Sequence, residues 1–367
     1  MIKVLSVFGT RPEAIKMAPV VKELERHPEQ IASRVCVTAQ HREMLDQVLN
    51  LFEIKPDYDL DLMIPGQTLS GLTARVFTEL DAVVAREKPD WVLVQGDTTT
   101  VMAASLVAFY HQIQVGHVEA GLRTNDKWQP FPEEINRKVT GVVADLHFAP
   151  TETAKDNLLH EGIHPSQIIV TGNTVIDALQ IVSGLPYDIE QGPLAHIPWE
   201  KRVILVTAHR RENFGKPLEQ ICMAIREIAE RYKEGIHIVY PVHLNPNVQL
   251  PVHQLLDNIP NITLLPPLDY LPLVQLMKRS YLVLTDSGGI QEEAPSLGKP
   301  VLVLRESTER QEAVAAGTVR LVGTDRAVVV ACVQDLLENP ETYARFARSV
   351  NPYGDGHAAE RIVNALL

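Results

Sequence analysis

The 367-residue sequence lacks the features that mark several classes of protein. It has three cysteines, Cys36, Cys222 and Cys332, far apart in apolar stretches, without the spacing of a metal site or a disulfide framework. We expect them to be buried, reduced thiols. A net charge of −12 gives no basic face for nucleic acid. No apolar run approaches membrane-spanning length, and no signal peptide precedes the first strand-like residues. We therefore expect a cytoplasmic protein with no metal and with no nucleic-acid or membrane partner.

The sequence alternates short apolar runs with segments of helical periodicity. Runs at 3–8, 91–95 and 115–118 are typical of buried parallel strands, and the pattern restarts at Val203. This alternation predicts βαβ units and an α/β protein with two doubly wound, Rossmann-like domains, 1–172 and 173–352. Gly172 and Asn173 mark a plausible hinge. The tail, 353–367, holds a short amphipathic helix that could cap either domain.

Polar clusters follow the predicted strands of the first domain at their carboxyl ends. They read GTRPE from Gly9, QHR from Gln40, GDTTT from Gly96 and EAGLRT from Glu119. In an open α/β sheet the carboxyl ends of the strands form one rim, where ligands bind. Four clusters on one rim predict a binding site more strongly than any one of them.

The turn after the first strand contains a single glycine, Gly9, so the GxGxxG dinucleotide fingerprint is absent and we expect no cofactor. Arg11 and Lys16 lie near the start of the following helix, where the helix dipole disfavours cations. They are therefore candidates for contact with an anion. The alternative is that both are solvated surface charges.

The stretch from Thr285 to Arg305 resembles a nucleotide site. Ser287, Gly288 and Gly289 follow an apolar strand and can bring backbone N–H groups to an anion at a helix start. Glu292 and Glu293, one turn later, are placed to accept hydrogen bonds from ribose hydroxyls. The pattern favours a nucleoside diphosphate pocket. An ordinary capped strand–turn–helix remains the alternative.

Several long blocks resemble one enzyme family along nearly the whole chain. They are GTRPEAIK, TAQHREMLDQ, QGDTTT, HVEAGLRT, PFPEEINR, TAHRREN and TDSGGIQEEAPSLGKPVLVLRESTERQE. In this order they resemble the non-hydrolysing UDP-N-acetylglucosamine 2-epimerases. The resemblance implies a glycosyltransferase-B-like fold, with two domains facing across a cleft and the last helix returning to the first domain. It also implies a homodimer that interconverts UDP-GlcNAc and UDP-ManNAc for polysaccharide biosynthesis, through elimination of UDP to 2-acetamidoglucal and re-addition.

The resemblance also assigns residues. It implies catalytic roles for Asp97, Glu119, Glu133, Arg137 and His209, and nucleotide-sugar contacts for Arg11, Lys16, Ser287, Gly288, Gly289, Glu293 and Arg310. From the residues alone, Asp97 could instead cap a helix, Glu133 could be a first-turn acid and His209 a surface histidine. Which carboxylate is the base and which the acid stays open.

Other family positions are matched less completely. A second, activating UDP-GlcNAc site would use Gln40, Glu43, Gln67, Glu134, Arg210 and His243. Gly66 stands where the family often has arginine. Leu268 and Leu273 replace a polar and an aromatic residue near the uracil, so apolar packing and backbone groups would recognise the base.

Three other functions fit the same fold. They are a hydrolysing epimerase that releases ManNAc and UDP, a UDP-sugar glycosyltransferase, and a nucleotide-sugar sensor without activity. The chain shows no fused kinase domain and no basic or apolar acceptor patch. Three carboxylates and a histidine on the rim exceed what binding alone requires.

Overall fold

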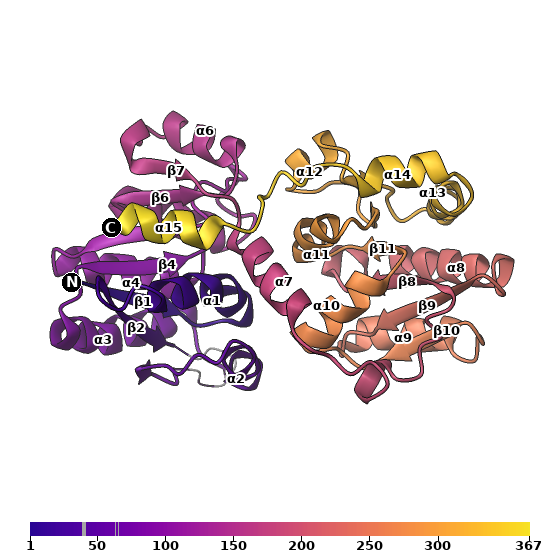
Figure 1. The fold of residues 1–367 in the computed structure, drawn as a ribbon, viewed down its shortest axis with the longest axis horizontal. Helices are drawn as coiled ribbons and strands as arrows, with labels where there is room; N and C mark the ends of the chain where they lie inside the picture. The colour runs from indigo at the N-terminus through magenta and orange to yellow at the C-terminus, as the bar shows by residue number, and fades with distance from the viewer. Residues whose placement is uncertain (39–41, 63, 65) are drawn as a thin grey trace. The chain divides into compact units, whose positions relative to one another are not determined.

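The computed structural model describes residues 1–38, 42–62, 64 and 66–367, so Gln40 of the predicted activating site lies outside the described residues. The chain divides into two compact units. The first is Met1–Gln180 with Tyr353–Leu367, and the second is Ile181–Pro352 (Figure 1). No helix in the described ranges is both long and apolar enough to cross a membrane.

The first unit is built on a parallel sheet whose strand order is β3-β2-β1-β4-β5-β6-β7. The strands are β1 (Ile2–Phe8), β2 (Ile31–Val37), β3 (Tyr58–Asp59), β4 (Trp91–Gln95), β5 (Gln114–Val118), β6 (Leu146–Ala149) and β7 (Ile168–Val170). The helices are α1 (Arg11–Glu25), α2 (Arg42–Leu51), α3 (Leu69–Glu87), α4 (Thr99–Tyr110), α5 (Glu133–Val143), α6 (Glu152–His160), α7 (Thr174–Gly184) and α15 (Ala358–Leu366), with a 3₁₀ turn, η1 (Pro165–Gln167).

The second unit repeats this architecture with strand order β10-β9-β8-β11-β12-β13, again parallel. Its strands are β8 (Arg202–Thr207), β9 (Ile236–Pro241), β10 (Ile262–Leu265), β11 (Leu282–Thr285), β12 (Val301–Val303) and β13 (Val319–Leu321). Its helices are α8 (Lys216–Arg231), α9 (Pro246–Leu256), α10 (Tyr270–Arg279), α11 (Gly288–Glu293), α12 (Gln311–Ala315), α13 (Arg326–Glu338) and α14 (Pro340–Ala347), with 3₁₀ turns η2 (Gly192–Leu194), η3 (Arg211–Asn213) and η4 (Ala294–Leu297).

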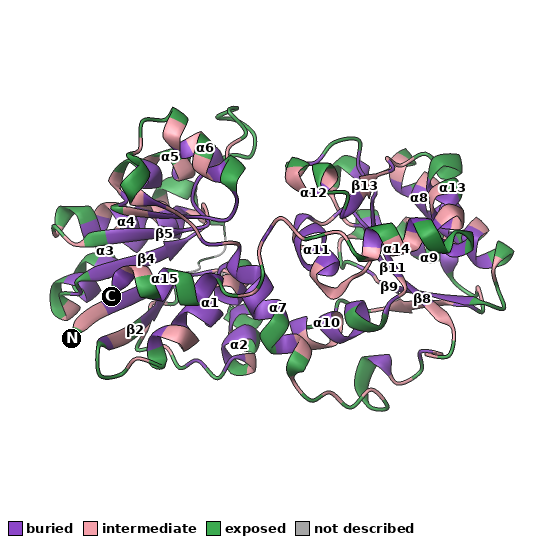
Figure 2. Cartoon of the chain, turned by 45° about the horizontal axis from the view of Figure 1, so that its top comes forward, coloured by how far each residue is buried: buried purple, intermediate pink, exposed green. Residues whose placement is uncertain are grey.

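The strands are buried because helices cover the sheets, as Figure 2 shows. In the first unit the apolar faces of α3 and α4 pack on the central strands through residues such as Val76, Leu80 and Val107. Central strands such as β4 and β11 are therefore buried along their whole length, and all but their last residues are apolar. Cys36 and Cys222 are buried as expected, but Cys332 is only half-buried, because it lies at the edge of the core of the second unit.

Both sheets have a topological switch point, where the strand order reverses direction. It lies between β1 and β4 in the first unit and between β8 and β11 in the second. Ligands of doubly wound folds bind outside the carboxyl ends of the strands at this point. The segments that begin at Gly9 and Gly96 follow β1 and β4, so two of the four polar clusters, GTRPE and GDTTT, lie at the switch point of the first unit. The segments that begin at Ala208 and Asp286 follow β8 and β11 at the switch point of the second unit.

The carboxy-terminal segment packs on the first unit, with α15 in contact with α1 (Figure 1). Asn173 N–H donates to Tyr353 O at 2.7 Å, and Ala359 N–H donates to the Asp177 carboxylate at 2.8 Å. These bonds keep the start of α7 in the first unit. The compact units divide after Gln180, inside α7, and the hinge after Gly172 stays a prediction.

Gly172 makes the close approach of the returning segment possible. Its φ is +88°, and a Cβ added there would lie 3.3 Å from both Gly354 Cα and Tyr353 O. We predict that Gly172→Ala lowers the free energy of unfolding by about 1–2 kcal/mol, the cost of left-handed backbone in an L-residue. Urea denaturation measures it. Gly184→Ala is the control, because Gly184 has open space around it, and it should not destabilise. Equal stability of Gly172→Ala and wild type would contradict the prediction.

Candidate active site

Glu13 ties together the two loops at the switch point of the first unit. Its carboxylate accepts hydrogen bonds from Gly9 N (2.9 Å) and Thr10 N (2.6 Å), after β1, and from Thr98 Oγ1 (2.6 Å), after β4. Thr10 caps α1, and its hydroxyl and Glu13 form a capping box. Burial raises the pKa of Glu13, and the bonds to Thr98, Gly9 and Thr10 oppose the rise. The sequence contains Glu13 within GTRPE, but its role was not predicted.

Glu119 lies at the end of β5, held by three side chains. Lys16 Nζ is 2.6 Å from Glu119 Oε1, Asn173 Nδ2 donates to the same oxygen at 3.2 Å, and Gln95 Nε2 donates to Oε2. The backbone of Glu119 is left-handed, with φ of +62°. Such a conformation costs about 1–3 kcal/mol in a residue other than glycine and tends to occur at functional sites. Neither Gln95 nor Asn173 was predicted, because each is far from Glu119 in sequence.

Asp97 is paired with Arg137. Asp97 Oδ2 accepts from Arg137 Nε at 2.9 Å and lies 2.6 Å from Nη2. No residue in the described part of the chain donates to the other oxygen, Oδ1. Thr98, not Asp97, is the N-cap of α4, so the capping alternative for Asp97 is excluded. Asp97 therefore presents one free carboxylate oxygen at the rim.

The first turn of α5 supplies two further carboxylates. Glu134 is fully buried, lies 3.1 Å from Arg137 Nη1 and accepts from Thr124 N and Asn125 N, both at 3.1 Å. Glu133 is half-buried, and its Oε2 is buried without a hydrogen-bond partner among the described residues. Glu134, predicted for the activating site, thus supports the Asp97–Arg137 pair.

The Asp286 carboxylate joins two loops at the switch point of the second unit, as Glu13 does in the first. It follows β11 and is fully buried. Its Oδ2 accepts from His209 N (2.8 Å), Arg210 N (2.8 Å) and Asn213 Nδ2 (2.9 Å), which all follow β8. One carboxylate oxygen therefore sets the backbone that carries His209.

His209 is half-buried, and its ring stacks on that of His243. Its ring and that of His243 are 5.3 Å apart between centroids and inclined by 22°. Burial lowers the pKa of His209, the Asp286 carboxylate opposes this, and His243 and Arg210 lower the pKa further. His209 is therefore not the surface histidine of the alternative interpretation.

Arg310 lies against the start of α11. A Cβ added to Gly288 would be 2.7 Å from Arg310 Cζ, so only glycine permits this approach. The guanidinium lies 2.8 Å from Glu292 Oε1 and also pairs with Glu309. The Arg310 guanidinium therefore lies directly against Gly288 in the loop that follows β11, between the carboxylates of Glu292 and Glu309.

Ser287, Glu292 and Glu293, which were expected to contact the nucleotide, each have a different hydrogen-bond partner in the structure. Ser287 N–H donates to Thr285 Oγ1 at 2.9 Å, so this N–H is used within the turn, and the contact of Ser287 with an anion stays a prediction. Glu292 Oε1 accepts from Arg310 Nε at 3.0 Å, and its contact with a ribose stays a prediction. Glu293 is buried and accepts from Tyr270 Oη at 2.7 Å. Gly289 lies beside Glu293 in the first turn of α11.

The remaining predicted residues are spread over both units. Arg11 is the first residue of α1, and Glu43 is exposed on α2. The Gln67 side chain accepts from Arg75. Arg210 lies 3.5 Å from Glu309.

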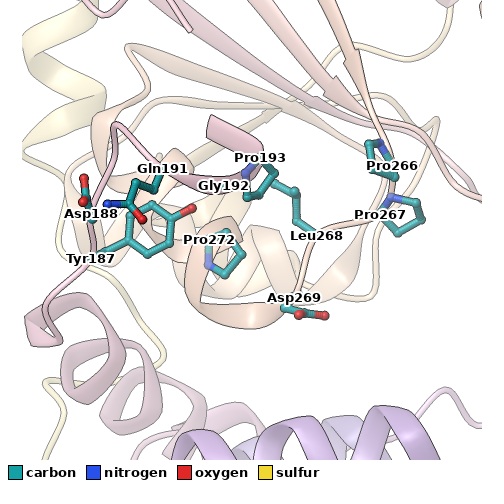
Figure 3. Close-up of a pocket in the computed structure, with 10 residues that line it drawn as sticks. All are labelled: Tyr187, Asp188, Gln191, Gly192, Pro193, Pro266, Pro267, Leu268, Asp269 and Pro272. Atoms are coloured by element: carbon teal, nitrogen blue, oxygen red, sulfur yellow. The ribbon is translucent and has the colours of Figure 1, made fainter. Parts of the chain in front are cut away.

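A cavity of about 510 Å³ lies beside the loop expected to recognise the base. Its lining includes Pro193, Pro266, Pro267 and Pro272, and Leu268 extends into it toward Pro193 (Figure 3). The Tyr187 hydroxyl, which has no hydrogen-bond partner among the described residues, also borders it. Leu273 does not line this cavity, so the two substituted leucines do not share it.

The fold defines the class of protein. A crystal structure of the glycotransferase of kitacinnamycin has a TM-score of 0.64 at 13% identity, covering all of this chain and 99% of that one. At this identity the likeness concerns the fold alone. It places the chain among two-domain, glycosyltransferase-B-like proteins.

The sequence comparisons identify the family. The family model for UDP-N-acetylglucosamine 2-epimerase matches residues 22–367. A UDP-N-acetylglucosamine 2-epimerase of Salmonella typhimurium is 58% identical over 370 residues, which cover 99% of this chain and 98% of the relative. The crystal structure of the Neisseria meningitidis UDP-GlcNAc 2-epimerase bound to UDP-GlcNAc has a TM-score of 0.91 at 55% identity and covers 99% of each chain. This chain belongs to the UDP-N-acetylglucosamine 2-epimerase family.

Two buried histidines below the rim predict a loss of stability in acid. Burial lowers the pKa of His117 to about 3 and that of His147 to about 4, against roughly 6.5 in an unfolded chain. The unfolded chain therefore binds protons that the folded chain does not, and stability falls as the pH drops below 6.5. We predict that His147→Leu reduces this loss by up to about 1.4 kcal/mol per pH unit.

Urea denaturation at a series of pH values from 7 to 5 measures the slope. The control is a change at the exposed His160, such as His160→Gln, which should leave the slope unchanged. A His147→Leu slope equal to that of the wild type would contradict the prediction.

Proposed function

We propose that this protein interconverts UDP-GlcNAc and UDP-ManNAc by eliminating UDP and adding it back with inversion at C2. The observation that carries the proposal is the set of paired carboxylates at the switch point of the first unit. Asp97 and Glu119 lie on neighbouring loops, since a Cβ added to Gly96 would be 3.9 Å from Glu119 Oε2. Each carboxylate is held by a cation, Arg137 and Lys16 respectively.

The chemistry explains why such groups are needed. The C2 hydrogen is not next to a carbonyl, so direct deprotonation is very unfavourable. When the C1–O bond to UDP breaks, that bond's electron pair leaves with the diphosphate and positive charge develops at C1. A carboxylate then takes the C2 proton, and the C2–H electrons form the C1=C2 double bond of 2-acetamidoglucal. Re-addition reverses these steps, with the proton delivered to the opposite face of C2 by an acid.

The carboxylates of the first unit suit proton transfer. Asp97 has one oxygen fixed by Arg137 and one free, while Glu119 is fixed by Lys16, Gln95 and Asn173. Fixed orientation of this kind is the main contribution of a site that only moves protons and stabilises charge. Glu133, with a buried unpartnered oxygen, is the third candidate. The assignment of base and acid among the three remains open.

The second unit suits the nucleotide. Arg310, lying against Gly288, and the N–H groups of Gly288 and Gly289 at the start of α11 provide positive charge and donors for a diphosphate. His209, whose backbone Asp286 holds, is placed to stabilise the departing UDP. Glu293, positioned by Tyr270, is the candidate acceptor for ribose hydroxyls. In the first unit, Arg11 and Lys16 on α1 add cationic contacts. The crystal structure of the Neisseria meningitidis relative is bound to UDP-GlcNAc, which supports a UDP-sugar as the ligand.

Substitution of the paired carboxylates tests the proposal. In D₂O the wild type should place deuterium at C2 of the UDP-sugar, which NMR detects. We predict that Asp97→Asn and Glu119→Gln slow exchange and epimerisation by about 10²- to 10⁴-fold, the usual contribution of acid–base catalysis, while UDP still binds.

The matched control is Glu25→Gln, which should leave both rates unchanged, because Glu25 is exposed and pairs with Lys22 in the last turn of α1, at the end of the helix that lies away from the rim. Binding of UDP-GlcNAc by the wild type without exchange would contradict epimerisation and favour a sensor or a transferase. Release of free ManNAc and UDP would indicate the hydrolysing reaction.

We also propose that UDP-GlcNAc activates the enzyme at a second site. Two residues of the predicted set contact the His209 region: His243 stacks on its ring, and Arg210 shares the Asp286 carboxylate with it. Binding at these residues could therefore alter His209. We expect sigmoidal kinetics with UDP-GlcNAc, and a reaction of UDP-ManNAc that stalls without trace UDP-GlcNAc. Steady-state rates in both directions test this, and hyperbolic curves in both would count against it. Homodimer formation, cytoplasmic location and the role in polysaccharide biosynthesis stay predictions from the family.

A further inference from the structure

We infer that His117 is a positioning residue for Asp97, acting through the backbone carbonyl of Gly96. His117 lies on β5, and Gly96 directly follows the neighbouring strand β4. The inference rests on the proposed function, in which Asp97 is one of the carboxylates that transfer protons. His117 itself is not placed in contact with substrate.

The bond that carries the inference is short and buried. His117 Nε2 lies 2.7 Å from Gly96 O, and His117 is 1% exposed. A carbonyl oxygen can only accept, so the imidazole must donate, and Nε2 must carry the proton. Nδ1 has no partner among the described residues, as expected of the neutral tautomer with a single N–H. The ring therefore offers one donor, and that donor is used on Gly96.

The position of Gly96 O determines the position of Asp97. The Gly96 carbonyl and the Asp97 N–H belong to one planar peptide unit, so rotation of that plane moves the Asp97 backbone. Gly96 has a φ of +82°, where glycine is flexible. The turn is held on its other sides by Gly96 N, which donates to Val118 O at 3.0 Å, and by Asn136 Nδ2, which donates to Asp97 O at 2.9 Å. Without His117 the carbonyl would lose its donor, and one of these constraints would be gone.

The same strand end also carries Glu119. Within three consecutive residues, His117 binds Gly96 O, Val118 accepts from Gly96 N, and Glu119 begins the following loop. The Gly96 peptide is therefore held at both its N–H and its C=O by the strand that supplies the second carboxylate. His117 thus helps to set the separation between Asp97 and Glu119, on which removal and delivery of the C2 proton depend.

His147 provides an internal comparison. It lies on β6 as the register partner of His117 and is fully buried, but neither of its nitrogens has a hydrogen-bond partner among the described residues. The two histidines share residue type, burial and layer of the sheet. They differ in the bond to Gly96, so matched substitutions separate the effect of that bond from the effect of altering a buried ring.

The test compares His117→Leu with His117→Gln. Leucine fills similar space without a donor, whereas the glutamine amide can place an N–H near the position of Nε2. We expect His117→Leu to lower kcat and the rate of deuterium entry at C2 by about 10- to 100-fold, the usual effect of a catalytic group displaced by about 1 Å. KM and the affinity for UDP should change little, since the nucleotide contacts are untouched. His117→Gln should recover most of kcat.

Two further measurements distinguish positioning from a structural role. His147→Leu should retain wild-type kcat. In an Asp97→Asn background, His117→Leu should lower kcat little further, because the effects of substituting residues that act as a unit are not additive. Far-UV circular dichroism and thermal unfolding check that each variant folds. If His117→Leu does not fold, His117→Asn takes its place, since that shorter amide cannot reach Gly96 O.

The outcomes are distinct. A folded His117→Leu with wild-type kcat overturns the inference, and so does full additivity with Asp97→Asn. A similar loss of kcat in His147→Leu, or failure of His117→Gln to recover activity that His117→Leu lost, also overturns it. A wild-type protein that does not exchange deuterium at C2 refutes the proposed function itself, and that result is independent of any His117 variant.

Discussion

The site depends on one buried carboxylate at the switch point of each sheet. The loops that leave the carboxyl ends of the strands have backbone N–H groups without partners in the sheet, and unpaired buried donors are costly. In the first unit Glu13 accepts from two such groups and from Thr98, and in the second Asp286 accepts from two and from Asn213. Each carboxylate joins the loops of two strands that are distant in sequence. The side chains proposed to act on the substrate extend from these braced loops.

Sequence patterns predict the strands and the rim well, because continuous apolar runs and the polar clusters that follow them are local signals. The family blocks further indicate which rim residues to examine. Glu13, Gln95, Asn173, Tyr270 and Asp286 escaped notice as site residues because their partners are distant in sequence. The bond from Thr98 to Glu13, for example, spans 85 positions. No periodicity indicates such a pair.

Two local patterns contain groups whose contacts in the fold their composition does not indicate, for a related reason. Ser287 has the composition of an anion-binding turn, yet the Thr285 hydroxyl takes its N–H. Gly172 and Asn173 have the composition of a hinge, yet both lie against the returning carboxy-terminal segment. In both cases the fold brings a side chain or a chain segment against residues whose partners the sequence does not indicate. Local sequence determines that a turn forms, but distant parts of the chain determine which partners its N–H and C=O groups bond to.

Burial separates the residues that build the rim from those available to a ligand. Glu13, Glu134 and Asp286 are buried, and each bonds to backbone N–H groups. His117 is their counterpart for a carbonyl, since it supplies a donor where they supply acceptors. Asp97, by contrast, keeps 27% of its side chain exposed and one oxygen free of bonds from the described residues. In the irregular backbone at a strand end, the N–H groups need acceptors and the C=O groups need donors. A rim that carries acid–base chemistry therefore requires buried ionisable residues that hold the backbone, beside exposed ones that are free to react.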